Sequence, residues 1–188
     1  MSFRVLVIPE DPTHNGYILK PLVEALAADA GRPAARVIVL SSPRLTGYDH
    51  ARRAIAEELV DAYRHFDLWL FFPDADRASD AAMAALEEEL ADKGIRMLAC
   101  PAVPEVEIYA SVAFRQELGR WAQARESRRF KEMHFEPLLR RHGDPRRAGQ
   151  GRDLMIAESL KNLPLLLQLC PELQALRDRM AALASAGR

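Results

Sequence analysis

Residues 67–76, Asp67-Leu-Trp-Leu-Phe-Phe-Pro-Asp-Ala-Asp76, form the stretch that decides the fold. The part from residue 67 to 72 is the most hydrophobic short run of the chain. A run this short, with apolar side chains at consecutive positions, is typical of a strand that is buried on both faces of a parallel sheet. We therefore expect a central strand at residues 67–72, with a polar loop beyond its carboxyl end.

Three further apolar runs predict strands at residues 3–8, 35–40 and 95–99. Between the four runs, the apolar residues recur at helical spacing at residues 17–29, 49–66 and 79–93. This alternation of strand and helix predicts an α/β fold, with a parallel sheet of about four strands flanked by helices and joined by right-handed crossovers. In such sheets the functional loops lie beyond the carboxyl ends of the strands.

The character of the chain changes near Val112. Residues 103–109 are expected to be a loop or a short edge element. They are followed by a long Arg-rich helix, a Gly-rich loop at residues 142–152, and two C-terminal helical stretches that separate at Cys170-Pro171. We expect an α/β domain at residues 1–111 and a helical appendage at residues 112–188, packed together as one structural unit.

Composition narrows the possible classes of protein. The chain has 188 residues, 49% of them hydrophobic, which is enough for one sizeable core. A formal net charge of -1 gives the whole molecule no general attraction to nucleic acid or membrane. Cys100 and Cys170 belong to no Cys-x-x-Cys or Cys/His cluster, which argues against a disulfide framework or structural zinc. The first residues lack the features of a signal peptide, and no apolar run approaches the ~20 residues that span a bilayer, so we expect a cytoplasmic protein with no membrane partner.

Three acidic residues stand at predicted strand ends. Glu10 follows the first strand, and Asp74 and Asp76 follow the third. Carboxylates on neighbouring loop tips are typical of a hard-cation site for Mg²⁺ or Mn²⁺, which suits phosphodiester chemistry. The alternative is that Glu10 caps the next helix while the two aspartates are ordinary loop acids.

Four segments, in order, resemble a family of Toprim-like proteins. This family is related to the OLD-type nucleases and to uncharacterised bacterial proteins that are often linked with phage defence. The segments are Val7-Ile-Pro-Glu10-Asp-Pro-Thr-His14 with Tyr17-Ile-Leu-Lys-Pro-Leu22, Phe72-Pro-Asp74-Ala-Asp76, Ala102-Val-Pro-Glu105-Val-Glu107-Ile-Tyr109, and Cys170-Pro-Glu-Leu173.

The resemblance implies a Toprim-like, Mg²⁺-dependent fold that cuts or joins DNA or RNA, with a partner ATPase as one expected partner. It implies that Glu10 is the general acid/base and that Asp74 and Asp76 are metal ligands. The chain differs from the family at two positions: Asp11 stands where a Gly is usual, and a histidine, which favours softer metals, stands where an acid is expected. A possible secondary site comprises Asp11, His14, Glu105 and Glu107.

Basic residues concentrate in the second part of the chain. Between Phe114 and Arg152 there are eleven Lys or Arg residues against five Asp or Glu. We expect two groups to bind nucleic-acid phosphates: one on a single helix face and one in the Gly-rich loop, namely Arg125, Arg128 and Arg129, and Arg146, Arg147 and Arg152. The alternative is a solvated helix with internal Glu–Arg pairs, such as Glu136 with Arg140. Phe130 and Phe135 are expected in the core.

Three functional hypotheses follow. The leading one is a divalent-metal-dependent, Toprim-like nuclease or nuclease-related protein. The second is a non-catalytic protein with the same scaffold that binds a partner protein or nucleic acid. The third is a receiver-like phosphoacceptor, which the acidic loops favour but the absence of a lysine after the fourth strand disfavours. A homodimer through residues 163–169 is also conceivable, although a core role for this apolar stretch is favoured.

Overall fold

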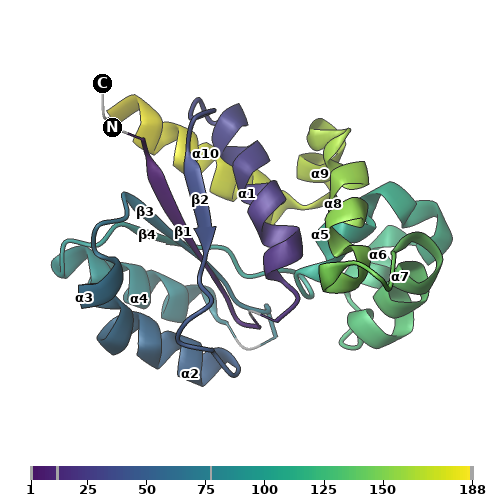
Figure 1. Cartoon of the computed structure of the whole chain (residues 1–188), viewed down its shortest axis with the longest axis horizontal. Helices are drawn as coiled ribbons and strands as arrows, with labels where there is room; N and C mark the ends of the chain where they lie inside the picture. Colours follow the sequence, from purple (N-terminus) through teal and green to yellow (C-terminus); the bar gives the residue numbers. More distant parts are fainter. Residues whose placement is uncertain (1, 12, 77, 187–188) are drawn as a thin grey trace.

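The computed structural model describes residues 2–11, 13–76 and 78–186. At its centre is a parallel sheet of four strands in the order β2-β1-β3-β4 (Figure 1). The strands are β1 (Arg4–Pro9), β2 (Arg36–Val39), β3 (Leu68–Phe72) and β4 (Met97–Ala99). The predicted α/β fold with a four-stranded parallel sheet is therefore confirmed.

The two central strands carry the apolar runs that the sequence predicted to be buried. All five residues of β3 are buried, and so are five of the six residues of β1. Side chains alternate between the two faces of a strand. Val7 and Leu70 therefore join the core on one face of the sheet, while Ile8 and Trp69 join the core on the other.

The chain reverses direction across the sheet at β1. From β1 it passes to β2 on one side, and then returns beyond β1 to β3 on the other side. Right-handed crossovers in opposite directions place their helices on opposite faces. Accordingly, α1 (Gly16–Asp29) packs on one face, whereas the other face is covered by α2 (Tyr48–Arg53), the π-helical turn η1 (Ala54–Glu58), α3 (Leu59–Tyr63) and α4 (Asp80–Asp92).

The region after β4 contains many short helices. They are α5 (Glu107–Ser111), η2 (Val112–Leu118), α6 (Trp121–Arg125), η3 (Lys131–Phe135), α7 (Glu136–His142), η4 (Ala148–Gly151), α8 (Arg152–Leu160), α9 (Leu163–Leu169) and α10 (Pro171–Ala186). No helix in the described ranges is both long and apolar enough to cross a membrane.

One prediction for this region is wrong, and another holds only in part. The single long helix expected from Val112 is interrupted at Gly119, whose φ of 73° cannot continue a right-handed helix, and again at residues 126–129. In the segment predicted to be a loop or a short edge element, residues 103–106 do form a loop, but residues 107–109 begin α5. The break between α9 and α10 does occur at Cys170-Pro171, as predicted.

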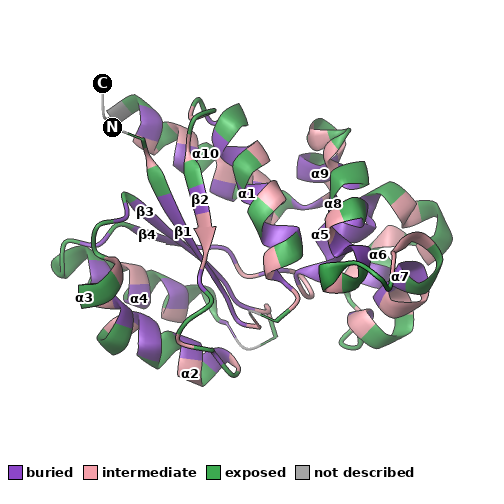
Figure 2. Cartoon of the chain, in the orientation of Figure 1, coloured by how far each residue is buried: buried purple, intermediate pink, exposed green. Residues whose placement is uncertain are grey.

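The helices after β4 extend the core on the face of the sheet that α1 covers. Helix α10 returns to lie beside α1 (Figure 1), and its Leu173 and Leu176 are buried in the same core as Val5. Phe130 and Phe135 are fully buried in this core, as expected. Helix α9 is partly buried (Figure 2). Its Leu166 and Leu167 lie in the core, which agrees with the core role that the sequence favoured for residues 163–169.

Candidate functional site

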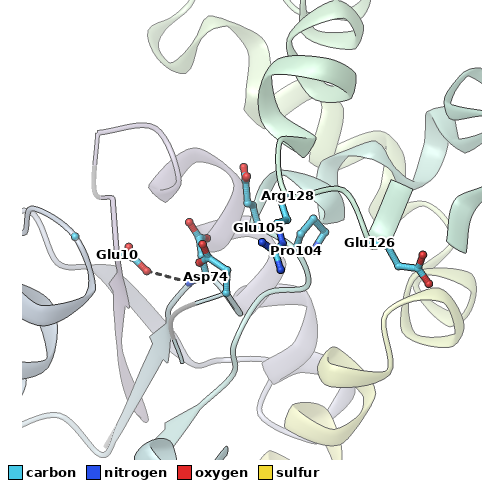
Figure 3. A pocket seen from close by; sticks show the side chains of 8 residues that line it. Glu10, Asp74, Pro104, Glu105, Glu126 and Arg128 are labelled. Atoms are coloured by element: carbon cyan, nitrogen blue, oxygen red, sulfur yellow. Dashed lines mark hydrogen bonds between the residues drawn. The ribbon is translucent and has the colours of Figure 1, made fainter. Parts of the chain in front are cut away.

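The site lies where the chain reverses across the sheet, beyond the carboxyl ends of β1 and β3. Glu10 follows β1 directly, and its backbone N–H donates to the carbonyl oxygen of Phe72 over 3.3 Å. The Glu10 carboxylate accepts a hydrogen bond from the backbone N–H of Asp74 over 3.0 Å (Figure 3). The Glu10 side chain therefore joins the ends of the two central strands and does not cap α1. Ligand sites in open α/β sheets occur at this kind of switch point.

A backbone extension of the sheet brings a third segment to the same edge. Asp74 forms an isolated parallel bridge with Ala102, and the N–H of Ala75 donates to the Ala102 carbonyl over 2.9 Å. This pairing continues the β3–β4 ladder beyond the regular strands. It places Glu105 next to the Asp-x-Asp segment, although thirty residues separate them in sequence.

These segments line a pocket of about 300 Å³ (Figure 3). Most of the lining residues are acidic, namely Glu10, Asp74, Asp76, Glu105 and Glu126. The others are Gly47, Pro104 and Arg128. The three carboxylates predicted from the sequence are thus gathered in one pocket. Asp76 reaches it from a turn that follows the strand.

The carboxylates in and around the pocket disfavour one another's ionised form. Burial raises the pKa of Asp74 to about 8, and four nearby carboxylates act in the same direction: those of Glu10, Glu107, Glu105 and Asp76. Burial, followed by the charge of Glu107, raises the pKa of Glu105 to about 7. Near neutral pH the pocket therefore retains protons that ordinary carboxyl groups would release.

The donor set of the pocket fits a hard divalent cation. Carboxylate oxygens are the ligands that Mg²⁺ and Mn²⁺ prefer, and the Oδ1 atom of Asp74 is buried without a hydrogen-bond partner. Within the described residues, however, no three His, Cys, Asp or Glu side chains are arranged to hold a metal ion together. The pocket carboxylates would have to turn toward a shared ion to bind it.

The secondary-site residues do not form a second cluster of this kind. The Oδ1 atom of Asp11 accepts the backbone N–H of Thr13 over 2.8 Å, which stabilises the loop after β1. His14 is half-buried, and burial together with the charge of Arg152 lowers its pKa. Neither Asp11 nor His14 lines the pocket.

Glu107 lies deeper than Glu105 and has a cationic partner. It is buried, and its Oε1 atom lies 3.7 Å from the Nζ of Lys131. Burial raises the pKa of Glu107, while the charges of Lys131 and Arg152 oppose the rise. Glu107 is therefore held in an ion pair with Lys131.

The six arginines expected to bind phosphates have different surroundings. Arg125 forms two hydrogen bonds to the Glu172 carboxylate, at 2.7 and 3.2 Å, and another to the carbonyl of Leu169. Arg147 pairs with Asp153. Arg152 is buried and donates to the carbonyl of Gly149, so its expected role as an exposed phosphate ligand is not supported by its position.

The other three arginines are exposed. Arg128 and Arg129 lie in the turn after α6, so the prediction that they share a helix face with Arg125 is wrong. Only Arg128 of these six lines the pocket. Arg146 lies in the loop before η4, where its backbone N–H donates to Asp144 over 2.9 Å.

Sequence reasoning missed three residues that line the pocket, namely Gly47, Pro104 and Glu126. Gly47 follows β2, and its position in a loop after a strand was the only signal for it. The order of the strands, which the sequence did not reveal, is what brings that loop to the site. Glu126 was counted among the acids of the basic segment, but nothing local indicated that it would meet the sheet edge.

Comparisons with protein-family models, with curated proteins and with solved structures found no match. The α/β fold and the geometry of the pocket therefore carry the functional argument.

Proposed function

We propose that this chain is a Toprim-like, divalent-metal-dependent protein that acts on nucleic-acid phosphodiesters. The observation that carries the proposal is the crowded carboxylate pocket at the switch point of the sheet. In this pocket the pKa of Asp74 is raised to about 8, and one of its oxygens is buried without a partner. A divalent cation would stabilise the ionised carboxylates that burial and mutual repulsion now destabilise.

The residues of the pocket divide into two roles in this proposal. Asp74 and Asp76 would hold Mg²⁺ or Mn²⁺, together with Glu10. When bound, such an ion polarises a phosphoryl oxygen and lowers the pKa of bound water. Glu10 is held against the backbone of Asp74 and is 9% exposed, so its position at the pocket is fixed and it can exchange a proton with a group bound there.

The resemblance noted in the sequence supports the choice of substrate class. The motif acid Glu10 lines the same pocket as Asp74 and Asp76, although it is far from them in the chain. A receiver-like phosphoacceptor is less well supported, because the described chain continues from β4 into helices without a fifth strand. The non-catalytic alternative keeps the fold without the metal.

The test is calorimetric titration of Mg²⁺ and Mn²⁺ into the wild type and the Asp74→Asn/Asp76→Asn variant. The same samples are assayed for cleavage of single- and double-stranded DNA and RNA. We expect metal binding and cleavage in the wild type and neither in the variant. Asp80→Asn is the matched control, because Asp80 is an exposed aspartate at the start of α4 and outside the pocket.

The outcomes separate the hypotheses. Wild-type protein that binds no metal and cleaves none of the substrates would refute the proposal and favour the non-catalytic scaffold. Metal binding that survives in the double variant would place the ion elsewhere in the molecule.

A further inference from the structure

The pocket has two walls of different origin. The carboxylates of Glu10, Asp74 and Glu105 come from the edge of the sheet, whereas Glu126 and Arg128 come from the turn between α6 and η3. In Figure 3 the guanidinium of Arg128 points into the pocket, while the Glu126 carboxylate lies on the far side from Glu10. The helical region therefore brings one cation to an otherwise acidic cavity.

The turn that carries Arg128 is held by other residues. The N–H of Ser127 donates to the Ala124 carbonyl over 3.2 Å, and the next apolar residue, Phe130, is fully buried. These contacts fix the backbone without using the Arg128 side chain, which is exposed. Within the described residues, no carboxylate lies within 4.0 Å of the Arg128 guanidinium nitrogens.

Three of the other five arginines expected to bind phosphates form structural contacts. Arg125 bonds the start of α10, Arg147 bonds Asp153, and Arg152 packs over the ring of Phe135 at 5.4 Å. Arg128 differs from them because it combines exposure with a place in the pocket lining. An exposed guanidinium that lines the pocket without an ion pair has its N–H donors available for an anion bound there.

We propose that Arg128 binds a backbone phosphate of a nucleic-acid strand held in this pocket. The inference rests on the proposed function. The carboxylates alone would repel a phosphate, so the anion requires cations on both sides: a divalent ion at the sheet edge and a guanidinium on the opposite wall. The planar guanidinium matches two phosphate oxygens at once, which a lysine ammonium does not.

The test measures binding of two fluorescein-labelled probes, a thymidine DNA oligonucleotide and a uridine RNA oligonucleotide, in Mg²⁺ by fluorescence anisotropy. We expect Arg128→Gln to weaken binding about tenfold and to lower the slope of log affinity against log salt by about 0.7, the value for one phosphate of a single strand. Arg128→Lys should recover part of the affinity. Arg129→Gln is the matched control, because Arg129 is adjacent and exposed but does not line the pocket, and it should change affinity less than about twofold.

Failure of this inference can be told apart from failure of the proposed function. Equal effects of Arg128→Gln and Arg129→Gln, or no wild-type binding of either probe, would overturn the role of Arg128. The calorimetric Mg²⁺ titration is repeated on Arg128→Gln, in which metal binding should be equal to or tighter than in the wild type because a nearby positive charge is gone. Absence of Mg²⁺ binding in the wild type would instead overturn the proposed function, and the inference with it.

Discussion

The raised pKa of Asp74 makes the stability of the metal-free protein depend on pH. The folded state keeps the Asp74 proton up to about pH 8, whereas the same carboxyl in the unfolded chain has its ordinary pKa of 3.8. Between these values the folded state binds one more proton than the unfolded state. Raising the pH therefore removes stability, and Asp74→Asn should abolish this part of the dependence.

The size of the stability loss depends on the pH interval between the pKa of Asp74 in the unfolded chain and its pKa in the folded protein. Each pH unit in which only the folded state holds the proton removes about 1.4 kcal/mol. From about pH 6 to about pH 8 the expected loss is about 2 kcal/mol, since the group begins to ionise at the upper end. For a chain of this size, that difference lowers the Tm by roughly 4 to 8 °C.

The assay is thermal unfolding followed by circular dichroism in EDTA, at several pH values, for the wild type, Asp74→Asn and Asp80→Asn. The wild type and Asp80→Asn should lose stability together as the pH rises, while the Asp74→Asn curve should be flatter by about 2 kcal/mol. Adding Mg²⁺ should raise the Tm of the wild type more at the higher pH, because the ion competes with the proton, and should leave Asp74→Asn unchanged. Parallel wild-type and Asp74→Asn curves in EDTA would show that Asp74 is already ionised in the fold and would refute the reasoning.

Three further changes test the surroundings of the pocket. Lys131→Met should cost about 2 kcal/mol at neutral pH in urea unfolding, and less at acidic pH, where the buried Glu107 gains a proton; an effect independent of pH would contradict the ion pair at 3.7 Å. Gly149→Ala should cost roughly 2 kcal/mol, because its φ is 71° and a Cβ would lie 2.4 Å from the Tyr17 ring. Adding Tyr17→Ala should recover the steric part of that loss in a double-mutant cycle, whereas strict additivity would argue against the contact. Arg125→Met should lower stability by about 2 kcal/mol by leaving a half-buried carboxylate at the start of α10 without its partner, and an unchanged urea midpoint would exclude a stabilising pair.

The sheet and its acidic edge were predictable because local patterns determine them. The run at residues 67–72 is too apolar and too short for anything but a buried strand, and Asp74 must then follow its carboxyl end. Glu10 follows the first strand by the same logic. Since the strands are parallel, both side chains had to reach the same edge whatever the strand order.

The second wall of the pocket could not be predicted in this way. The spacing of Arg125, Arg128 and Arg129 suggested one helix face. The helix ends at Arg125, however, and Arg128 and Arg129 lie in the turn that follows it. The partner of Arg125 stands 47 residues further along the chain. Contacts at such separations depend on how the helices pack, and no pattern within a short window reports them.

The packing of α10 connects the two walls of the pocket. One wall of the pocket belongs to the sheet edge and the other to the turn after α6, so the pocket keeps its shape only if the helical region is held against the sheet. Arg125, at the end of α6, binds the start of α10 through Glu172, and α10 is in turn buried beside α1 on the sheet through Leu173. Arg125, which directly precedes the turn that carries Arg128, is therefore anchored to the sheet through α10. A structural ion pair outside the pocket thus sets where the pocket's cation stands relative to its carboxylates.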